Sequence, residues 1–210
     1  MRKSIVLTGA AAVVATAGTL SAGLFDPSRW FGSGDSFAQC SETTVGGADI
    51  GGPFELVDET GRTVTEQDVI TGPTLIYFGY TFCPDICPTD NTRNALAIER
   101  LDERGLEVKP VFISIDPERD TPERLADFTD AFHERMLGLT GTPEQVRAAS
   151  QAYKTFFQKE DTDDDYYLVD HTTMSYLVLP EEGFVEFYRR DVPPDEMADS
   201  IACFAEAATG

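Results

Sequence analysis

Two cysteines, Cys83 and Cys87, stand four residues apart and are the residues of this chain with the clearest chemical capacity. They follow an apolar segment, residues 74–78, that is typical of a buried strand. A spacing of four places two side chains on one face of a helical turn, so both sulfur atoms can reach one soft metal ion or each other. The pair therefore predicts either a metal site or a redox-active dithiol.

Histidine is the natural third ligand, and the chain has two, His133 and His171. His133 falls late in an expected helix, where the helix dipole favours an imidazole, and is predicted to be a helix-end residue. His171 follows Asp170 just before an expected central strand, a place from which a loop can reach the cysteine turn. Two thiolates and one imidazole suit Cu(I) and accept Cu(II), whereas a structural zinc ion needs a fourth ligand. We expect Asp170 to orient His171 or tune the site.

The N-terminal residues predict export from the cytosol. Arg2 and Lys3 precede an uncharged run, residues 4–25, that is long enough to span a bilayer. Ala15–Ala17 offers a small-residue cleavage site, but the aromatic pair Trp30–Phe31 just beyond the run favours an uncleaved anchor. We expect a single span in a bacterial inner membrane with the domain in the periplasm, or a soluble periplasmic domain if the leader is cleaved.

The chain divides into three expected parts: a signal anchor or signal peptide at 1–25, a tether at 26–50 and a folded domain at 51–210. Export changes how the two remaining cysteines are interpreted, because thiols outside the cytosol tend to form disulfides. Cys40 precedes the folded part and Cys203 lies near its end. Since domain termini are often close together, we predict a structural Cys40–Cys203 disulfide.

The charge of the chain excludes one class of partner. Lys and Arg number 16 against 37 Asp and Glu, and the net charge is −21. Nucleic acid phosphates would be repelled, so no nucleic-acid partner is expected. The acidic run 160–165 lacks the glycine and distal glutamate of a calcium loop and is predicted to be the solvated tip of an excursion.

Alternating strands and helices must position the cysteine pair. The pattern predicts strands near 54–57, 74–78, 111–115, 136–139, 175–179 and 184–188, and helices near 89–103, from 121, from 142 and at 194–207. Such an order implies an α/β sheet covered on both faces, with the cysteines at the carboxyl end of a central strand, where these sheets place their chemistry. The expected fold is thioredoxin-like, with an N-terminal β-hairpin and an inserted β-excursion before the His171 loop.

Three motifs carry a family resemblance: YFGYTFCPDICP at 77–88, VFISIDPERDTPERL at 111–125 and DHTT at 170–173. In this order they resemble the Sco/SenC family of copper proteins, and the similarity covers 51 to about 206. The resemblance implies a thioredoxin-like, membrane-tethered protein that helps to build the dinuclear copper centre of cytochrome c oxidase subunit II. The donor of that copper is not identified by the sequence.

The resemblance also implies the ligands. It implies one copper ion per chain, Cu(I) or Cu(II), held by Cys83, Cys87 and His171. Asp85, between the cysteines, and Asp170, beside the histidine, are carried over as supporting residues and not as ligands.

An enzyme is the alternative, namely a thiol–disulfide oxidoreductase that acts on the cysteines of that oxidase subunit and is recharged by an unidentified thiol reductant. The thioredoxin-like setting supports it. The CxxxC spacing and the lack of a proline just before Ser175 count against it. A peroxiredoxin is set aside, because Tyr80 and Ile76 stand where that pattern needs threonine and proline.

Overall fold

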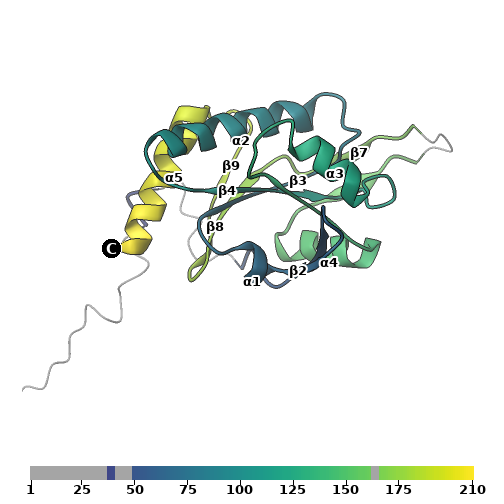
Figure 1. Ribbon diagram of the computed structural model, residues 1–210, viewed down its shortest axis with the longest axis horizontal. Helices are drawn as coiled ribbons and strands as arrows, with labels where there is room; N and C mark the ends of the chain where they lie inside the picture. Colours follow the sequence, from purple (N-terminus) through teal and green to yellow (C-terminus); the bar gives the residue numbers. More distant parts are fainter. Residues whose placement is uncertain (1–36, 41–48, 162–165) are drawn as a thin grey trace, which may run out of the picture. The chain divides into compact units, whose positions relative to one another are not determined.

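The structure is a computed structural model that describes residues 37–40, 49–161 and 166–210 (Figure 1). The expected leader, most of the tether and residues 162–165 of the acidic run lie outside the described residues. The predicted anchor, cleavage site and Trp30–Phe31 pair are therefore not tested by it. Within the described part, no helix is both long and apolar enough to cross a bilayer.

A seven-stranded sheet forms the centre of the described domain, in the order β2-β1-β5-β4-β3-β8-β9. The neighbours β3, β4 and β5 run parallel, and the other pairings are antiparallel. The strands are β1 (Glu55–Asp58), β2 (Thr63–Thr65), β3 (Thr74–Gly79), β4 (Lys109–Ser114), β5 (Leu137–Thr140), β8 (Ser175–Leu179) and β9 (Gly183–Tyr188). A separate two-stranded sheet pairs β6 (Phe157–Lys159) with β7 (Val169–His171).

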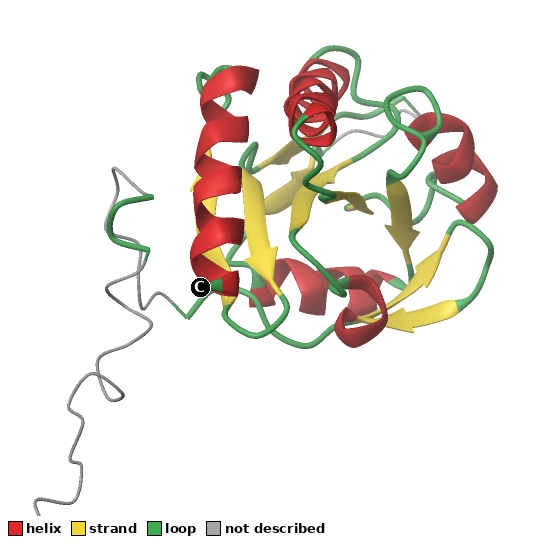
Figure 2. Ribbon diagram, turned by 60° about the vertical axis from the view of Figure 1, so that its left-hand side comes forward, coloured by secondary structure: helices red, strands yellow, loops and turns green. Residues whose placement is uncertain are grey.

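Helices cover both faces of the central sheet (Figures 1 and 2). They are α1 (Glu66–Val69), α2 (Ile86–Glu103), α3 (Pro122–Thr129), α4 (Pro143–Ala152) and α5 (Pro194–Thr209). Helices α2, α3 and α5 lie on one face, and α1 and α4 lie on the other. The expected α/β, thioredoxin-like fold class is confirmed.

Strand β3 is the centre of the core because all six of its residues are buried. Leu75 packs into a cluster with residues of α2 and α5. Ile76 and Phe78 belong to a second cluster that includes Tyr153, after α4. A strand covered on both faces must be apolar along its whole length, which explains the unbroken run in the sequence.

Two boundaries differ from the sequence expectation. Helix α2 begins at Ile86, so Cys87 lies in its first turn while Cys83 stays in the loop before it. The two cysteines therefore do not share one helical turn. His171 is the last residue of strand β7, and the excursion itself carries it, rather than a loop that follows the excursion.

A disulfide joins Cys40 to Cys203 on α5, with Cα atoms 5.5 Å apart. Phe37 lies beside it, with its ring centroid 5.4 Å from that of Phe204. The bond ties the segment 37–40 to the α5 face of the domain. It leaves Cys83 and Cys87 as free thiols.

Candidate metal centre

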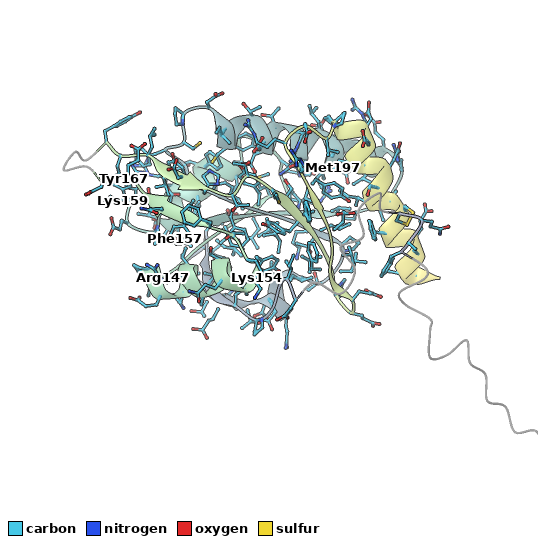
Figure 3. The ribbon with its side chains drawn as sticks, turned by 180° about the vertical axis from the view of Figure 1, so that it is seen from behind. Arg147, Lys154, Phe157, Lys159, Tyr167 and Met197 are labelled. Carbon is cyan, nitrogen blue, oxygen red and sulfur yellow. A yellow bond between two sulfur atoms is a disulfide. The ribbon has the colours of Figure 1, made fainter. Side chains whose placement is uncertain are left out.

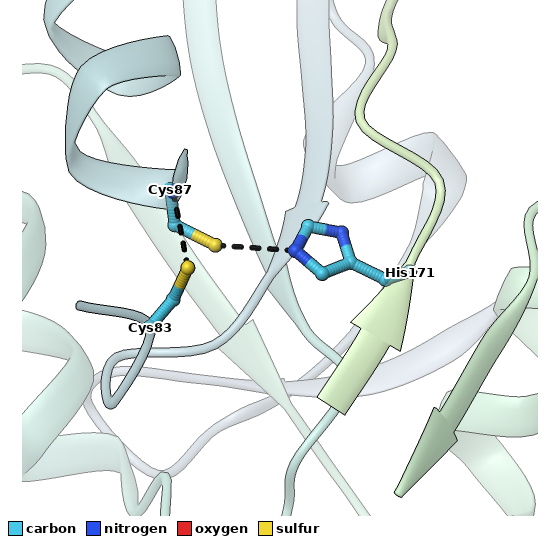
Figure 4. Close-up of side chains that lie close together, drawn as sticks. All are labelled: Cys83, Cys87 and His171. Carbon is cyan, nitrogen blue, oxygen red and sulfur yellow. Dashed lines mark hydrogen bonds between the residues drawn. The ribbon is translucent and has the colours of Figure 1, made fainter. Parts of the chain in front are cut away.

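The loop before α2, the first turn of α2 and the end of β7 bring Cys83, Cys87 and His171 together (Figure 4). Their donor atoms all lie within 4.8 Å of one another. The Sγ atom of Cys87 is 3.4 Å from Nε2 of His171. The three side chains predicted as ligands therefore lie together, although 84 residues separate Cys87 from His171 in the sequence.

The cysteine loop is compact because Gly79 ends β3 directly beneath it. A Cβ atom at position 79 would lie only 2.9 Å from Sγ of Cys87 and equally close to ring atoms of Tyr77 and Phe112. The side chain of Asn91 then donates to the Cys87 carbonyl at 2.8 Å and holds the first turn of α2 in place. Cys87 is completely buried and Cys83 is 8% exposed.

The two thiols are electrostatically unequal. Hydrogen bonds from the Cys87 thiol, and then from the backbone N–H groups of Cys87 and Asp85, lower the pKa of Cys83 against the opposing effect of burial. One of these bonds, from Cys87 N to Cys83 Sγ, measures 3.2 Å. The pKa of Cys87 is raised, first by the hydrogen bond that its own thiol donates to Cys83 and then by burial. Cys83 is therefore the thiolate of the copper-free pair, as expected near a helix N-terminus.

A backbone carbonyl orients His171. Its Nδ1 atom lies 2.9 Å from the Thr172 carbonyl oxygen, which only accepts hydrogen bonds, so Nδ1 carries the proton. In the neutral ring, Nε2 then presents its lone pair towards the cysteines. Tyr77 and Tyr80 flank the imidazole in T-shaped arrangements, with ring centroids 6.2 Å and 5.8 Å away. These contacts fix both the tautomer and the ring plane.

The two expected supporting aspartates lie nearby but act differently from the expectation. The Asp85 side chain is exposed and caps no backbone group of α2, and this residue reaches the site through its N–H group. Asp170 is exposed on β7, opposite Gln158. The orienting contact that the sequence assigned to Asp170 is made instead by the Thr172 carbonyl.

A buried polar group that the sequence analysis did not single out supports the site through Tyr77. Asp90, 2% exposed, accepts a hydrogen bond of 2.9 Å from the Tyr77 hydroxyl and one of 3.0 Å from Arg190. Burial is the main cause that raises the pKa of Tyr77, so its hydroxyl stays protonated. The available signal was an acidic residue three positions after Cys87, one helical turn along a buried face.

His133 lies outside this centre. Its Nε2 atom is 3.4 Å from Asp102, and its Nδ1 atom accepts the Arg135 N–H at 3.1 Å. These contacts give His133 a structural role after α3, in line with its expected helix-end position.

The donor set can be tested against a metal ion by its dimensions. With metal–sulfur bonds of about 2.3 Å and metal–nitrogen bonds of about 2.0 Å, a planar three-ligand site separates its donors by roughly 3.7–4.0 Å. The Cys87–His171 distance of 3.4 Å and the 4.8 Å limit for all three bracket that value. Two soft sulfurs and one imidazole match Cu(I) in chemistry as well as in size.

Comparison with known proteins gives this geometry a family context. The family model described as SCO1/SenC matches residues 42–206. Protein SenC of Rhodobacter capsulatus is 50% identical over 206 residues, which cover 98% of this chain and 91% of SenC. The mitochondrial SCO1 homolog 1 of Arabidopsis thaliana is 40% identical over 80% of this chain. The chain spans only about half the length of that mitochondrial relative.

Solved structures agree with the sequence comparison. Arabidopsis thaliana ScoI with copper bound superposes with a TM-score of 0.71 at 40% identity, covering 75% of this chain and 99% of ScoI. Bradyrhizobium japonicum ScoI with copper bound gives a TM-score of 0.67 at 36% identity, covering 73% of this chain and 98% of that one. The fold, the motif order and the similarity along most of the chain lead to one conclusion: this protein belongs to the SCO1/SenC family.

Proposed function

We propose that this protein binds one copper ion through Cys83, Cys87 and His171 and delivers it during assembly of cytochrome c oxidase, to the dinuclear copper centre of subunit II. The observation that carries the proposal is the convergence of two sulfurs and one imidazole nitrogen within 4.8 Å. Two relatives at 36–40% identity are described with copper bound. The family resemblance supplies the oxidase and its subunit as the destination.

The partial burial of the site suits a protein that binds copper and passes it on. His171 is half-buried, whereas the cysteines lie deeper in the domain, so the imidazole is the ligand nearest to solvent. Three ligands leave the ion under-coordinated, and a recipient thiolate can join before a donor ligand leaves. A closed four-ligand site would block that exchange.

The proposal places the domain outside the cytosol, held to the bacterial inner membrane by residues 4–25. The support is the pair Arg2 and Lys3, the uncharged run after them and the disulfide between Cys40 and Cys203. Fractionation of cells that express the full chain tests this part. Recovery of the protein in the cytosolic fraction would contradict it.

Copper stoichiometry tests the ligand assignment. Full-length protein, purified reduced and loaded anaerobically with Cu(I), should retain one copper per chain, and both Cys83→Ser and His171→Ala should lose it during competition with a chelator. His133→Ala is the matched control, because this histidine lies outside the site. Retention of one tightly bound copper by either ligand variant would show that the assignment is incorrect.

Complementation tests the destination. A strain without this gene should fail to load oxidase copper unless copper is added to the medium, and the wild-type gene should restore loading. His171→Ala should not restore it. If the protein were instead a thiol–disulfide reductase, the His171→Ala variant should still reduce an insulin-type substrate, because disulfide exchange does not require this histidine.

A further inference from the structure

The ligands of the metal centre stand on two separately built elements. Cys83 belongs to the loop between β3 and α2, and Cys87 to the first turn of α2, so both follow directly from a strand of the central sheet. His171 belongs to the two-stranded β6–β7 sheet, and no strand pairing joins the described residues of this sheet to the central sheet. Strand pairing therefore cannot fix the distance between the imidazole and the sulfurs, and other contacts must do so.

The segment 116–120, which follows β4, contacts the β6–β7 element through Tyr167. The Tyr167 hydroxyl donates to Oδ1 of Asp116 at 2.7 Å. Arg119 donates from Nη1 to the Tyr167 carbonyl at 3.0 Å, and its guanidinium carbon lies 3.5 Å from the centre of the Tyr167 ring. Lys159 lies 3.6 Å from the centre of the same ring, and Figure 3 shows it next to Tyr167. Two residues of one segment thus bind the element that carries His171.

The same segment also holds the cysteine loop. Asp120 accepts the backbone N–H of Thr81 at 3.0 Å and the Thr81 hydroxyl at 2.6 Å. The guanidinium of Arg119 lies 4.6 Å from the centre of the Phe82 ring, immediately before Cys83. Ser114 anchors the assembly to β4 by donating to Asp120 at 2.7 Å.

The residues that make these contacts are shielded from solvent. Asp120 is fully buried and Asp116 is 4% exposed, so neither carboxylate is available to solvent as an alternative partner. Arg119 forms an ion pair with Asp116, and its side chain is only 14% exposed. A largely buried, paired guanidinium that also contacts aromatic rings has a better defined position than a surface arginine.

We propose that the segment 116–120, with Arg119 at its centre, is a positioning bracket that sets the separation of His171 from Cys83 and Cys87. The proposal rests on the proposed function for its purpose, because the spacing matters only if the three side chains share a metal ion. None of the bracket residues is a ligand. They act through Tyr167 on one side and through Thr81 and Phe82 on the other.

Arg119→Ala is the direct test, with Arg124→Ala as the matched control. Arg124 also lies over the Phe82 ring, at 4.7 Å, but is exposed and belongs to α3. In copper-free protein, the Val169 amide reports docking of the His171 element, because it donates to the Tyr80 hydroxyl at 3.2 Å. Hydrogen exchange of this amide should accelerate about tenfold or more in Arg119→Ala and remain unchanged in Arg124→Ala.

Copper binding gives the second measurement. Arg119→Ala should weaken Cu(I) affinity about 10–100-fold, the range typical of residues that orient metal ligands, and should change the thiolate-to-Cu(II) charge-transfer spectrum. Arg124→Ala should match wild type in both. Identical exchange, affinity and spectrum in the two variants would overturn the proposal.

Two milder variants keep the test decisive if Arg119→Ala does not fold. Tyr167→Phe removes only the hydroxyl bonded to Asp116, and Thr81→Val removes only the hydroxyl bonded to Asp120. Each should weaken copper affinity about two- to tenfold while the protein remains folded, and wild-type affinity in both would overturn the bracket. If wild-type protein binds no copper, the proposed function fails, whereas the copper-free exchange of Val169 still tests the bracket on its own.

Discussion

Gly79 makes the sharpest prediction about the metal centre, because the space above it is occupied by the sulfur of Cys87. A methyl group at this position would lie 2.9 Å from Sγ of Cys87, from Cε2 of Phe112 and from Cε1 of Tyr77. Carbon contacts are comfortable at about 3.5 Å or more, so a neighbour must move by roughly 0.6 Å. The two rings are fully buried, and the Tyr77 hydroxyl is anchored on Asp90. We expect the cysteine to move.

Such a shift is large for a metal site, in which donor distances are held within about 0.2 Å. Gly79→Ala should therefore weaken Cu(I) affinity about tenfold or more, as misplaced ligand geometry does elsewhere. Overpacking of a close-packed core should also lower the free energy of unfolding by about 1–3 kcal/mol. Chelator competition under anaerobic conditions measures the first effect, and urea unfolding of copper-free protein measures the second.

Gly138→Ala separates the two effects. A methyl group at Gly138 would lie 2.8 Å from Cβ of Leu125 and 3.1 Å from a Glu59 carboxylate oxygen, a clash of similar severity that does not involve the ligands. This variant should lose stability to a similar degree and keep wild-type copper affinity. The reasoning would be refuted if folded Gly79→Ala bound copper as tightly as wild type, or if Gly138→Ala lost the same affinity.

Three further predictions concern the surroundings of the site. The Cys40–Cys203 disulfide closes a loop of 163 residues. Loop-closure entropy predicts that it stabilises the fold by about 5 kcal/mol, whereas disulfides typically contribute about 2–4 kcal/mol. Replacing both residues by serine should lower the urea-derived unfolding free energy by at least about 2 kcal/mol without changing copper affinity, and a loss below about 1 would contradict this. Because the pKa of Cys83 is lowered, reduced, copper-free protein should carry about one thiolate per chain at about pH 6. Ultraviolet absorption should detect this thiolate, and it should be absent in Cys83→Ser. The thiolate contributes fully to the stability of the fold above the ordinary thiol pKa, and this contribution declines as the pH falls through the lowered pKa of Cys83. Asp90→Ala removes the acceptor of the buried Tyr77 hydroxyl and should cost about 1–3 kcal/mol in urea unfolding; wild-type stability would argue against this role.

The sequence was sufficient to locate the three candidate ligands because each has a positional signal. Cys83 and Cys87 follow the carboxyl end of an apolar strand, and such strand ends gather at one edge of the sheet. His171 is one of two histidines and comes just before another central strand. The disulfide partners followed from the expected export and from the usual proximity of domain ends.

The contacts that orient those ligands had no such signal. The Thr172 carbonyl that fixes the His171 tautomer belongs to the backbone, and every residue type has one. The sequence analysis assigned the orienting role to the carboxylate of Asp170, because residue types reveal side-chain groups and not the positions of backbone carbonyls. Arg119 reaches Tyr167 across 48 residues through a ring face and a carbonyl, and neither contact has a characteristic spacing.

The described contacts give the three ligands unequal mechanical support. Cys87 is locked by α2, by Gly79 beneath it and by complete burial, whereas His171 ends a small sheet held to the domain by side-chain contacts. A shared metal ion adds a direct link between these two parts, so it should restrain the weaker one more. We expect copper loading to slow hydrogen exchange at Val169 and its β7 neighbours more than in the first turn of α2. Equal slowing in both places would show that the cysteine loop is as free to open as the histidine element, and that rigidity is not divided between the ligands in this way.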